Sequence, residues 1–410
     1  ETTLSVANIY EILGNTFYRR AIVFWGKPMS RVTVEPGGTV VKLCLGNEIM
    51  RFHAIWLRDN AQDYETRDQI NGQRLIALKQ IPSDTWVSDA RVEADSLLIT
   101  FKPENKVIRY DFDWLMENNY DEVKNLKRGW ISQDHETWGS DLAFVPSCDF
   151  DKLIKRNILT LKWLGDVRKY GFGKITNGPI TEGALFKVIE LFGYVRETNY
   201  GKHFEVRTEV NPSNLAFTGL ALQAHTDNPY RDPVPTLQLL YCLESSAAGG
   251  ENMLVDGFKA ITRLREENEE YFDLLSNYSA RFEYKNNKDV HLKSRRPIIE
   301  LSANGELLAI RFNNRSMSAV NDVPFDKMEN WYSAYRRLGE IIDDPNMEIT
   351  FRLNPGEAFI VDNTRVLHAR KGYSGTGKRW LQGCYSDKDG LNSAFYSLEK
   401  ALAKESSHEA

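Results

Sequence analysis

The stretch Ala224-His225-Thr226-Asp227-Asn228-Pro229-Tyr230 places an imidazole and a carboxylate two residues apart. Side chains on a β-strand repeat on one face at every second residue, so the sequence predicts that His225 and Asp227 point the same way. Two histidines and one carboxylate that converge can bind Fe(II) on one side and leave the other side open to substrate and oxygen. A buried histidine–aspartate hydrogen bond without any metal is the alternative interpretation of the same triplet.

A second histidine, His368, lies far downstream at the end of the run 359–368 (FIVDNTRVLH), whose apolar residues followed by polar ones predict a strand and then a turn. Arg379 follows it, at the start of the alternating run 380–385 (WLQGCY), which predicts a strand that enters the core. The planar guanidinium of an arginine suits a carboxylate. We therefore predict a metal site formed by His225, Asp227 and His368. The arginine beside it would bind a dicarboxylate, and this combination is typical of Fe(II)/2-oxoglutarate oxygenases.

Composition limits the classes of partner. The chain has 410 residues and a net charge of −5, with no block of lysine or arginine, which argues against general binding to nucleic acid or to membrane surfaces. Small molecules are the expected partners. Four scattered cysteines, with no Cys-x-x-Cys pair, are typical of reduced thiols in the cytoplasm. The sequence starts at Glu1 rather than at methionine, which leaves an upstream targeting segment open.

The distribution of short strands predicts two domains, with a boundary near residue 140. Residues 1–140 are expected to form a small β-rich domain, with strands at 32–34, 40–44, 50–57, 91–93 and 96–101. Residues 141–410 are expected to form the catalytic domain. Its predicted helices are 149–170, 182–192, 257–277 and 325–343, and its predicted strands are 171–176, 236–242, 349–353, 358–361 and 380–385. The polar tail 404–410 is expected to fray.

Several runs in a fixed order make the chain similar to a known family. They are 52–60 (FHAIWLRDN), 225–227 (HTD), 237–240 (LQLL), 249–250 (GG) with 255–258 (VDGF), 312–314 (FNN), 354–356 (NPG), and 362–363 (DN) leading to His368. They cover most of residues 50–390. The chain resembles the γ-butyrobetaine hydroxylase and trimethyllysine dioxygenase branch of the clavaminate/taurine dioxygenase superfamily.

The resemblance implies an α+β, mainly β fold: a double-stranded β-helix (jelly roll) with flanking helices, preceded by the small β-rich domain. It implies Fe(II) bound by the two histidines and the aspartate, 2-oxoglutarate bound by Arg379, O2 as the oxidant, and stimulation by ascorbate. Asn252 falls where relatives use a threonine or serine hydroxyl, and its amide can donate a similar hydrogen bond to the cosubstrate.

One departure concerns zinc. Members of this branch often carry a cysteine-rich zinc site directly after the Trp-Leu-Arg-Asp-Asn run, whereas here residues 61–66 are AQDYET. We expect an N-terminal domain without zinc that serves packing or dimer formation, and hence a homodimer.

The resemblance also implies an aromatic cage for a trimethylammonium group, because ring faces attract a cation that cannot donate hydrogen bonds. The cage positions carried over are Tyr200, Phe204, Phe217 and Tyr385, and the positions for the anionic end of the substrate are Asn214 and Asn314. Ordinary core packing is the alternative role for the four aromatic residues.

The expected reaction is hydroxylation of an unactivated C–H bond in a small quaternary-ammonium substrate with an acidic tail, with γ-butyrobetaine as the first candidate. A trimethylammonio-alkylphosphonate, trimethyllysine or a free amino acid are alternative substrates for the same chemistry. A catalytically silent β-helix protein that only binds a ligand is the non-enzymatic alternative.

Overall fold

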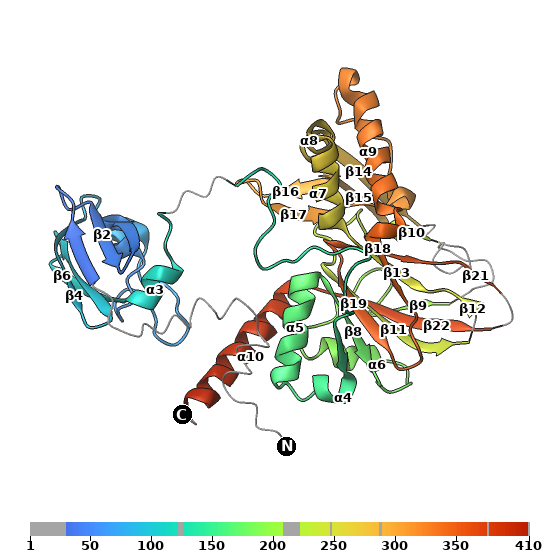
Figure 1. Cartoon of the computed structure of the whole chain (residues 1–410), viewed down its shortest axis with the longest axis horizontal. Helices are drawn as coiled ribbons and strands as arrows, with labels where there is room; N and C mark the ends of the chain where they lie inside the picture. Colours follow the sequence, from blue (N-terminus) through green and yellow to red (C-terminus); the bar gives the residue numbers. More distant parts are fainter. Residues whose placement is uncertain are drawn as a thin grey trace. The chain divides into compact units, whose positions relative to one another are not determined.

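The computed structural model describes residues 30–121, 126–207, 222–246, 248–286, 289–374 and 377–408. They form two compact units, which divide between residues 121 and 126 (Figure 1). The sequence placed this division near residue 140. The division lies earlier because the segment after it packs into the second unit: the Trp138 ring centroid lies 5.0 Å from that of Phe172, and its indole N–H donates to the Tyr170 carbonyl at 2.7 Å.

The N-terminal unit contains two antiparallel three-stranded sheets around one apolar core. The strands are β1 (Ser30–Val34), β2 (Val40–Leu45), β3 (Glu48–His53), β4 (Trp86–Glu93), β5 (Ser96–Lys102) and β6 (Lys106–Asp111), and the helices are α2 (Ala54–Asp59) and α3 (Phe112–Glu117). The prediction of a strand across 50–57 was wrong after His53. Ala54 and Leu57, three residues apart on one helical face, are both buried in the core.

Ion pairs hold the segment that follows α2. Arg58 donates to both carboxylate oxygens of Glu104, at 2.7 and 2.8 Å, and the Lys106 ammonium lies 2.8 Å from Asp63. Ala61 is buried in the core. Charged and apolar contacts therefore fix residues 58–63 in this unit.

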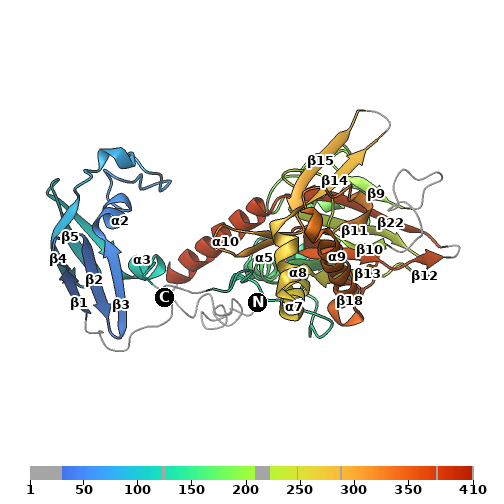
Figure 2. The ribbon, with the colours of Figure 1, turned by 90° about the horizontal axis from the view of Figure 1, so that it is seen from above.

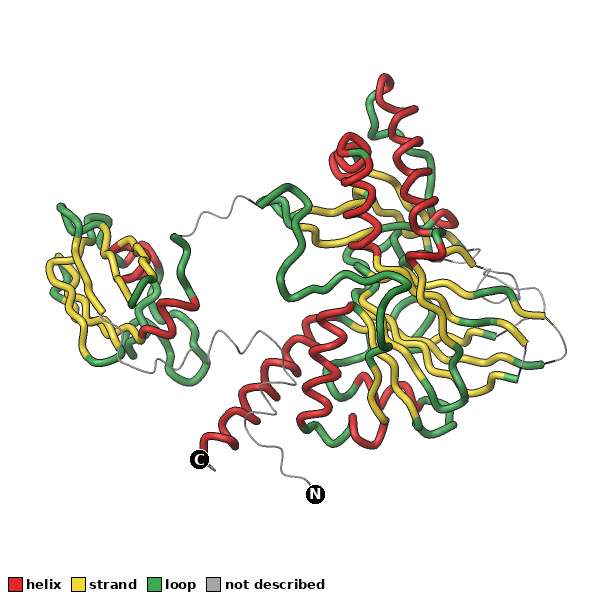
Figure 3. Tube along the Cα trace, viewed as in Figure 1, coloured by secondary structure: helices red, strands yellow, loops and turns green. Residues whose placement is uncertain are grey.

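Within the described residues, the second unit is built on a six-stranded and a four-stranded sheet (Figures 1 and 3). The six-stranded sheet has the order β7 (Ser147–Asp149), β8 (Phe172–Thr176), β19 (Ala358–Asp362), β11 (Leu237–Ser245), β22 (Arg379–Ser386) and β9 (Phe204–Val206). The four-stranded sheet has the order β10 (Leu222–His225), β20 (Val366–Arg370), β13 (Asn252–Asp256) and β18 (Glu348–Phe351). Only the β7–β8 pair in these two sheets is parallel. The secondary structure is therefore α+β with mixed sheets.

Residues alternate along each central strand between two apolar cores. On β11, Leu239 and Tyr241 pack toward the helices, whereas Leu240 packs against Leu254 and Phe359 in a core shared by strands of both sheets. The shared core places the inward positions of β11, β22, β13 and β20 around one interior space. The functional side chains described below occupy these inward positions.

Helices cover the outer surfaces of this unit. They are α4 (Phe150–Leu153), α5 (Ile158–Tyr170), α6 (Ala184–Ile189), α7 (Gly257–Glu267), α8 (Glu269–Asn277), α9 (Met328–Ile342) and α10 (Lys388–His408). The helices α4, α5, α6 and α10 pack on the outer face of the six-stranded sheet, while α7, α8 and α9 pack with the hairpins β14–β15 and β16–β17 (Figure 1). Figure 2 shows α7, α8 and α9 beside one another in a second view. The hairpin strands are β14 (Ser279–Lys285), β15 (His291–Pro297), β16 (Ile299–Leu301) and β17 (Leu307–Ile310), and β12 (Ala248–Gly249) pairs with β21 (Tyr373–Ser374).

Two predicted helices are interrupted where an asparagine caps a new helix. The side chain of Asn157 accepts backbone N–H groups at the start of α5, and that of Asn268 does so at the start of α8. The prediction of a frayed tail was also wrong for residues 404–408, which belong to α10, while residues 409 and 410 lie outside the described residues. None of the described helices is long and apolar enough to cross a membrane.

A fully buried ion pair and its hydrogen bonds join four distant segments of the second unit. The Arg365 guanidinium donates to both carboxylate oxygens of Asp256, at 3.0 and 2.8 Å, and to the backbone carbonyls of Glu136 and Lys169. Asp256 also accepts the N–H of Phe258 at the start of α7. Because Arg365 lies in the turn between β19 and β20, the pair fixes the entry to the strand that carries His368.

Candidate metal centre

His225, Asp227 and His368 form the cluster that the sequence predicted. One ligand atom from each lies within 4.8 Å of the other two, and all three side chains are largely buried. His225 and His368 stand directly opposite each other on β10 and β20, with ring centroids 4.6 Å apart. Two details differ from the predictions: Asp227 lies beyond the end of β10, and His368 lies within β20 rather than in a turn.

Hydrogen bonds orient these side chains. Nδ1 of His225 lies 2.7 Å from the Gln223 carbonyl and donates its N–H to it, while Nε2 faces Asp227, 3.3 Å from Oδ1. The backbone N–H of Asp227 donates to Asn363 at 2.7 Å, and the Asn363 amide donates back to the Asp227 carbonyl at 2.9 Å. Asn363 therefore holds the chain after β10 although the strand has ended.

The ionisation states suit a metal. Burial alone would raise the pKa of Asp227, but its contacts with the side chains of His225 and His368 hold that pKa well below its usual range. Burial, with His225 nearby, lowers the pKa of His368 to about 3. An ionised carboxylate and a neutral imidazole are the forms that bind metal ions. Neighbouring ligands of an octahedral ion with bonds of about 2.1 Å stand about 3 Å apart, close to the separation of Nε2 and Oδ1.

The cluster opens into a cavity of about 310 Å³. Six aromatic residues among those described line it, and they are Tyr200, Phe204, Tyr230, Tyr284, Phe359 and Tyr385. The Phe204 and Tyr385 ring centroids are 5.1 Å apart, those of Tyr230 and Tyr284 are 5.0 Å apart, and the Tyr200 and Tyr230 hydroxyls are 3.0 Å apart. Burial raises the pKa of Tyr230 to about 12 and that of Tyr200 further, so both hydroxyls are neutral.

The structure describes three of the four predicted cage residues. Tyr200, Phe204 and Tyr385 line the cavity, whereas Phe217 lies outside the described residues. Tyr230 and Tyr284 were not predicted. Tyr230 ends the stretch 224–230, and its closeness in sequence to Asp227 could have identified it as a cavity residue. No feature of the sequence around Tyr284, on β14, identifies it in the same way.

The predicted anion-binding asparagines do not line the cavity in the described part of the chain. Asn214 lies outside the described residues. The Asn314 amide donates to Gln223 at 2.6 Å, and its oxygen accepts the Tyr335 hydroxyl at 2.6 Å. Arg315 and Asn228 line the cavity instead. Nδ2 of Asn228 is buried and has no hydrogen-bond partner among the described residues.

Arg379 and Asn252 lie together in the cavity wall. Arg379, at the start of β22, is buried, and its Nη2 donates to the Asn252 side-chain oxygen at 3.0 Å. Asn252 begins β13, so the contact joins the two sheets. The structure thus brings together the arginine and the amide that the sequence analysis singled out separately.

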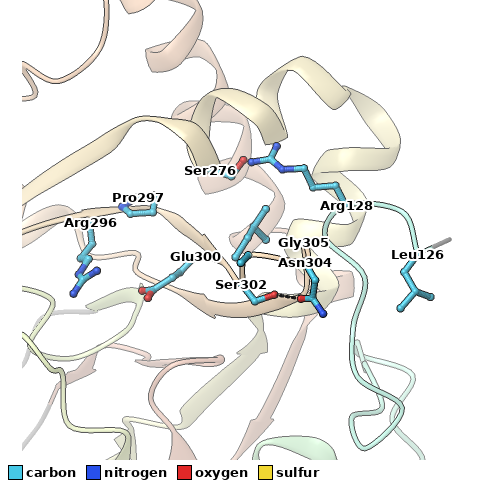
Figure 4. Close-up of a pocket in the computed structure, with 11 residues that line it drawn as sticks. Leu126, Arg128, Ser276, Arg296, Pro297, Glu300, Ser302, Asn304 and Gly305 are labelled. Carbon is cyan, nitrogen blue, oxygen red and sulfur yellow. Dashed lines mark hydrogen bonds between the residues drawn. The ribbon is translucent and has the colours of Figure 1, made fainter. Parts of the chain in front are cut away.

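A second, larger hollow of about 640 Å³ lies elsewhere on this unit (Figure 4). Its arginines are paired: Arg128 with Asp273, and Arg296 with Asp232. It contains none of the three clustered metal-ligating residues.

The buried His-Asp-His cluster, open to a cavity whose wall carries an arginine, defines the class of the protein as an Fe(II)- and 2-oxoglutarate-dependent dioxygenase. The chain belongs to the taurine catabolism dioxygenase TauD, TfdA family, whose model matches residues 135–385. Both histidines, the aspartate and Arg379 fall within the matched region.

Curated relatives carry the resemblance along most of the chain. The mitochondrial trimethyllysine dioxygenase of Mus musculus is 33% identical over 363 residues, which cover 86% of this chain and 84% of that protein. The gamma-butyrobetaine dioxygenase of Pseudomonas sp. (strain AK-1) is 31% identical and covers 85% of this chain and 91% of that protein. Among solved structures, the PvcB protein from Pseudomonas aeruginosa is 18% identical with a TM-score of 0.43, covering 55% of this chain and 79% of that one.

Proposed function

We propose that this enzyme hydroxylates an unactivated C–H bond of a small quaternary-ammonium substrate with an acidic tail. The observation that carries the proposal is the set of six aromatic residues lining the cavity that holds the His-Asp-His cluster. A trimethylammonium group cannot donate hydrogen bonds, so ring faces recognise it better than polar groups do. The names of the relatives, trimethyllysine dioxygenase and gamma-butyrobetaine dioxygenase, denote proteins that act on compounds of this kind.

In this proposal His225, Asp227 and His368 hold the iron. Arg379 binds the distal carboxylate of 2-oxoglutarate, and Asn252 fixes the guanidinium through the 3.0 Å hydrogen bond. Iron, when bound, uses 2-oxoglutarate and O2 to supply the oxidant, with succinate and CO2 as the products of the cosubstrate. The protein aims one C–H bond at the iron position and excludes water from it.

The family resemblance also supports a proposal about the fold and the N-terminal unit. We propose that the six-stranded and four-stranded sheets, which share one core, form the double-stranded β-helix. In this proposal the N-terminal unit folds without zinc, around its apolar core and the ion pairs of Arg58 and Asp63. The unit contributes to a homodimer, and the protein is located in the cytoplasm. Mass determination of the native protein, metal analysis and cell fractionation test these three points.

Groups for the acidic tail are present at the cavity. The resemblance assigns this role to Asn214 and Asn314, and we add Arg315 and Asn228, which line the cavity. A guanidinium suits either a carboxylate or a phosphonate.

Glu283 favours trimethyllysine over γ-butyrobetaine as the substrate. It lines the same cavity as Arg315, and the hydrogen bond from His291 lowers its pKa, so its carboxylate is ionised. A wall with both charges suits a head group that has an ammonium and a carboxylate. Trimethyllysine has such a head group, and γ-butyrobetaine has the carboxylate alone.

The deciding experiment measures succinate formed from 2-oxoglutarate with Fe(II) and ascorbate in the presence of single candidate substrates. The panel contains trimethyllysine, γ-butyrobetaine, a trimethylammonio-ethylphosphonate and free lysine. We expect stimulation by a trimethylammonium compound and none by lysine, with Glu283→Gln reducing turnover of trimethyllysine more than that of γ-butyrobetaine. Equal stimulation by lysine would reject the cage, and no turnover under any condition would favour a silent binding protein.

A further inference from the structure

Two donors from neighbouring strands meet on the same carboxylate oxygen of Asp227. Nε2 of Gln238 and the Tyr385 hydroxyl each lie 2.8 Å from Oδ2, and the two residues face each other across β11 and β22. A carboxylate oxygen accepts about two hydrogen bonds, so Oδ2 is fully used. The other carboxylate oxygen, Oδ1, faces the metal cluster and lies 3.3 Å from Nε2 of His225.

The chemistry of the pair fixes which way the Gln238 amide points. An ionised carboxylate only accepts hydrogen bonds, so the amide nitrogen must face Asp227 and the amide oxygen must face away from it. That oxygen, Oε1, is buried and has no hydrogen-bond partner among the described residues, and the whole side chain is 2% exposed.

A buried polar atom without a partner is unfavourable, and such an atom in a native fold calls for an explanation. A residue kept only for packing at this inward position of β11 would be better as leucine or methionine. The hydrogen bond from the amide to Asp227 is the feature that an apolar side chain could not reproduce.

We propose that Gln238 is a positioning residue that acts with the Tyr385 hydroxyl to hold Oδ2 of Asp227, so that the carboxylate binds iron through Oδ1 alone. A carboxylate that bound through both oxygens would occupy a position needed for the cosubstrate or O2. Tyr385 then has two roles, since its ring lines the cavity while its hydroxyl holds the ligand. The inference rests on the metal site of the proposed function.

The test compares metal binding by Gln238→Met, Tyr385→Phe and the wild-type full chain, with Co(II) alone as the probe and visible absorption as the readout. Loss of a group that orients a metal ligand typically costs about 10- to 100-fold in metal affinity. We expect about a 10-fold weaker Kd for each variant, a further loss in the double variant, and a changed Co(II) spectrum. Neither spectrum nor affinity would change if the two groups served packing alone.

Gln382→Met is the matched control. Gln382 is also a buried glutamine, on β22, but its amide donates to Glu205 and accepts the Gly183 N–H instead of contacting a metal ligand. Its substitution removes more internal hydrogen bonds than Gln238→Met does, yet we expect a Co(II) affinity within about twofold of the wild type.

Each outcome decides the inference. Wild-type Co(II) affinity in Gln238→Met would overturn it and leave the metal site intact, whereas no Co(II) binding by the wild type would reject the metal site as well. Should Gln238→Met fail to fold, Tyr385→Phe, which removes a single oxygen atom, decides alone. Unchanged affinity and an unchanged spectrum in that variant would contradict the proposal.

Discussion

Replacing Phe204 by leucine should weaken a trimethylammonium ligand more than its uncharged tert-butyl analogue. The Phe204 ring lies against Gly383, where any side chain would collide with it, and its centroid is 5.1 Å from that of Tyr385. This packing fixes the ring in the cavity wall. Leucine keeps an apolar side chain there but removes the negative face of the ring.

The magnitude follows from the environment of the ring. Cation–π contacts contribute about 0.5–1 kcal/mol at exposed sites and about 2 kcal/mol when desolvated. Phe204 is half-buried in the cavity wall, so we assign a value between these limits, about 1–2 kcal/mol, which corresponds to a roughly 5- to 30-fold increase in Kd. The tert-butyl analogue has the same shape without the charge and should lose only the contact area common to both ligands.

The assay is calorimetric titration of the metal-loaded protein with each ligand in the presence of 2-oxoglutarate, without oxygen. Phe186→Leu is the control, because Phe186 is an aromatic residue of α6 that packs against the helix-side core and does not line the cavity. Equal losses for the charged and uncharged ligands in Phe204→Leu would refute the reasoning, since they would mean that shape alone is recognised.

Four further outcomes follow from the structure. His225→Ala should abolish both metal binding and succinate formation, measured by dialysis with Fe(II) and by product analysis. Arg379→Met should raise the KM for 2-oxoglutarate about 100-fold with a smaller change in kcat, since a charge-assisted double hydrogen bond is lost. Asp256→Asn should lower the free energy of unfolding by about 3–5 kcal/mol in denaturant titration, because it leaves a buried guanidinium without its charge partner. Lys388 holds the pKa of Asp362 below its usual value against the effect of burial, so the stability that Asp362 contributes is present above about pH 4 and is lost as the pH falls further. Lys388→Met should raise the folded-state pKa of Asp362 and reduce this contribution, which unfolding curves measured at several pH values would record as a smaller loss of stability on acidification.

The clustering of His225, Asp227 and His368 was predictable because the motifs that carry these residues are local in sequence. The two-residue spacing of His225 and Asp227 identified the pair, although Asp227 lies beyond the strand and is held by Asn363 rather than by strand periodicity. Arg379 was predictable because an arginine at the start of an alternating run is a local feature. Its contact with Asn252 depends on the packing of two sheets and could not be derived from spacing.

The residues that were missed come from tertiary structure. Tyr284 lines the cavity from a hairpin that no motif in the sequence identifies, and the contact between Gln238 and Asp227 depends on the folded structure. Secondary structure was predicted least well where a polar side chain interrupts a periodic pattern. Asn268, which ends α7 and caps α8, divides a run that has helical spacing throughout.

The most direct test of the central claim is an incubation of the metal-loaded enzyme with trimethyllysine or γ-butyrobetaine, 2-oxoglutarate and ¹⁸O2, followed by mass spectrometry of both products. A dioxygenase of this kind should place one ¹⁸O atom in the hydroxylated trimethylammonium product and one in an equimolar amount of succinate. Succinate formed without any hydroxylated trimethylammonium product would contradict the substrate assignment, and labelled product without succinate would contradict the role of 2-oxoglutarate.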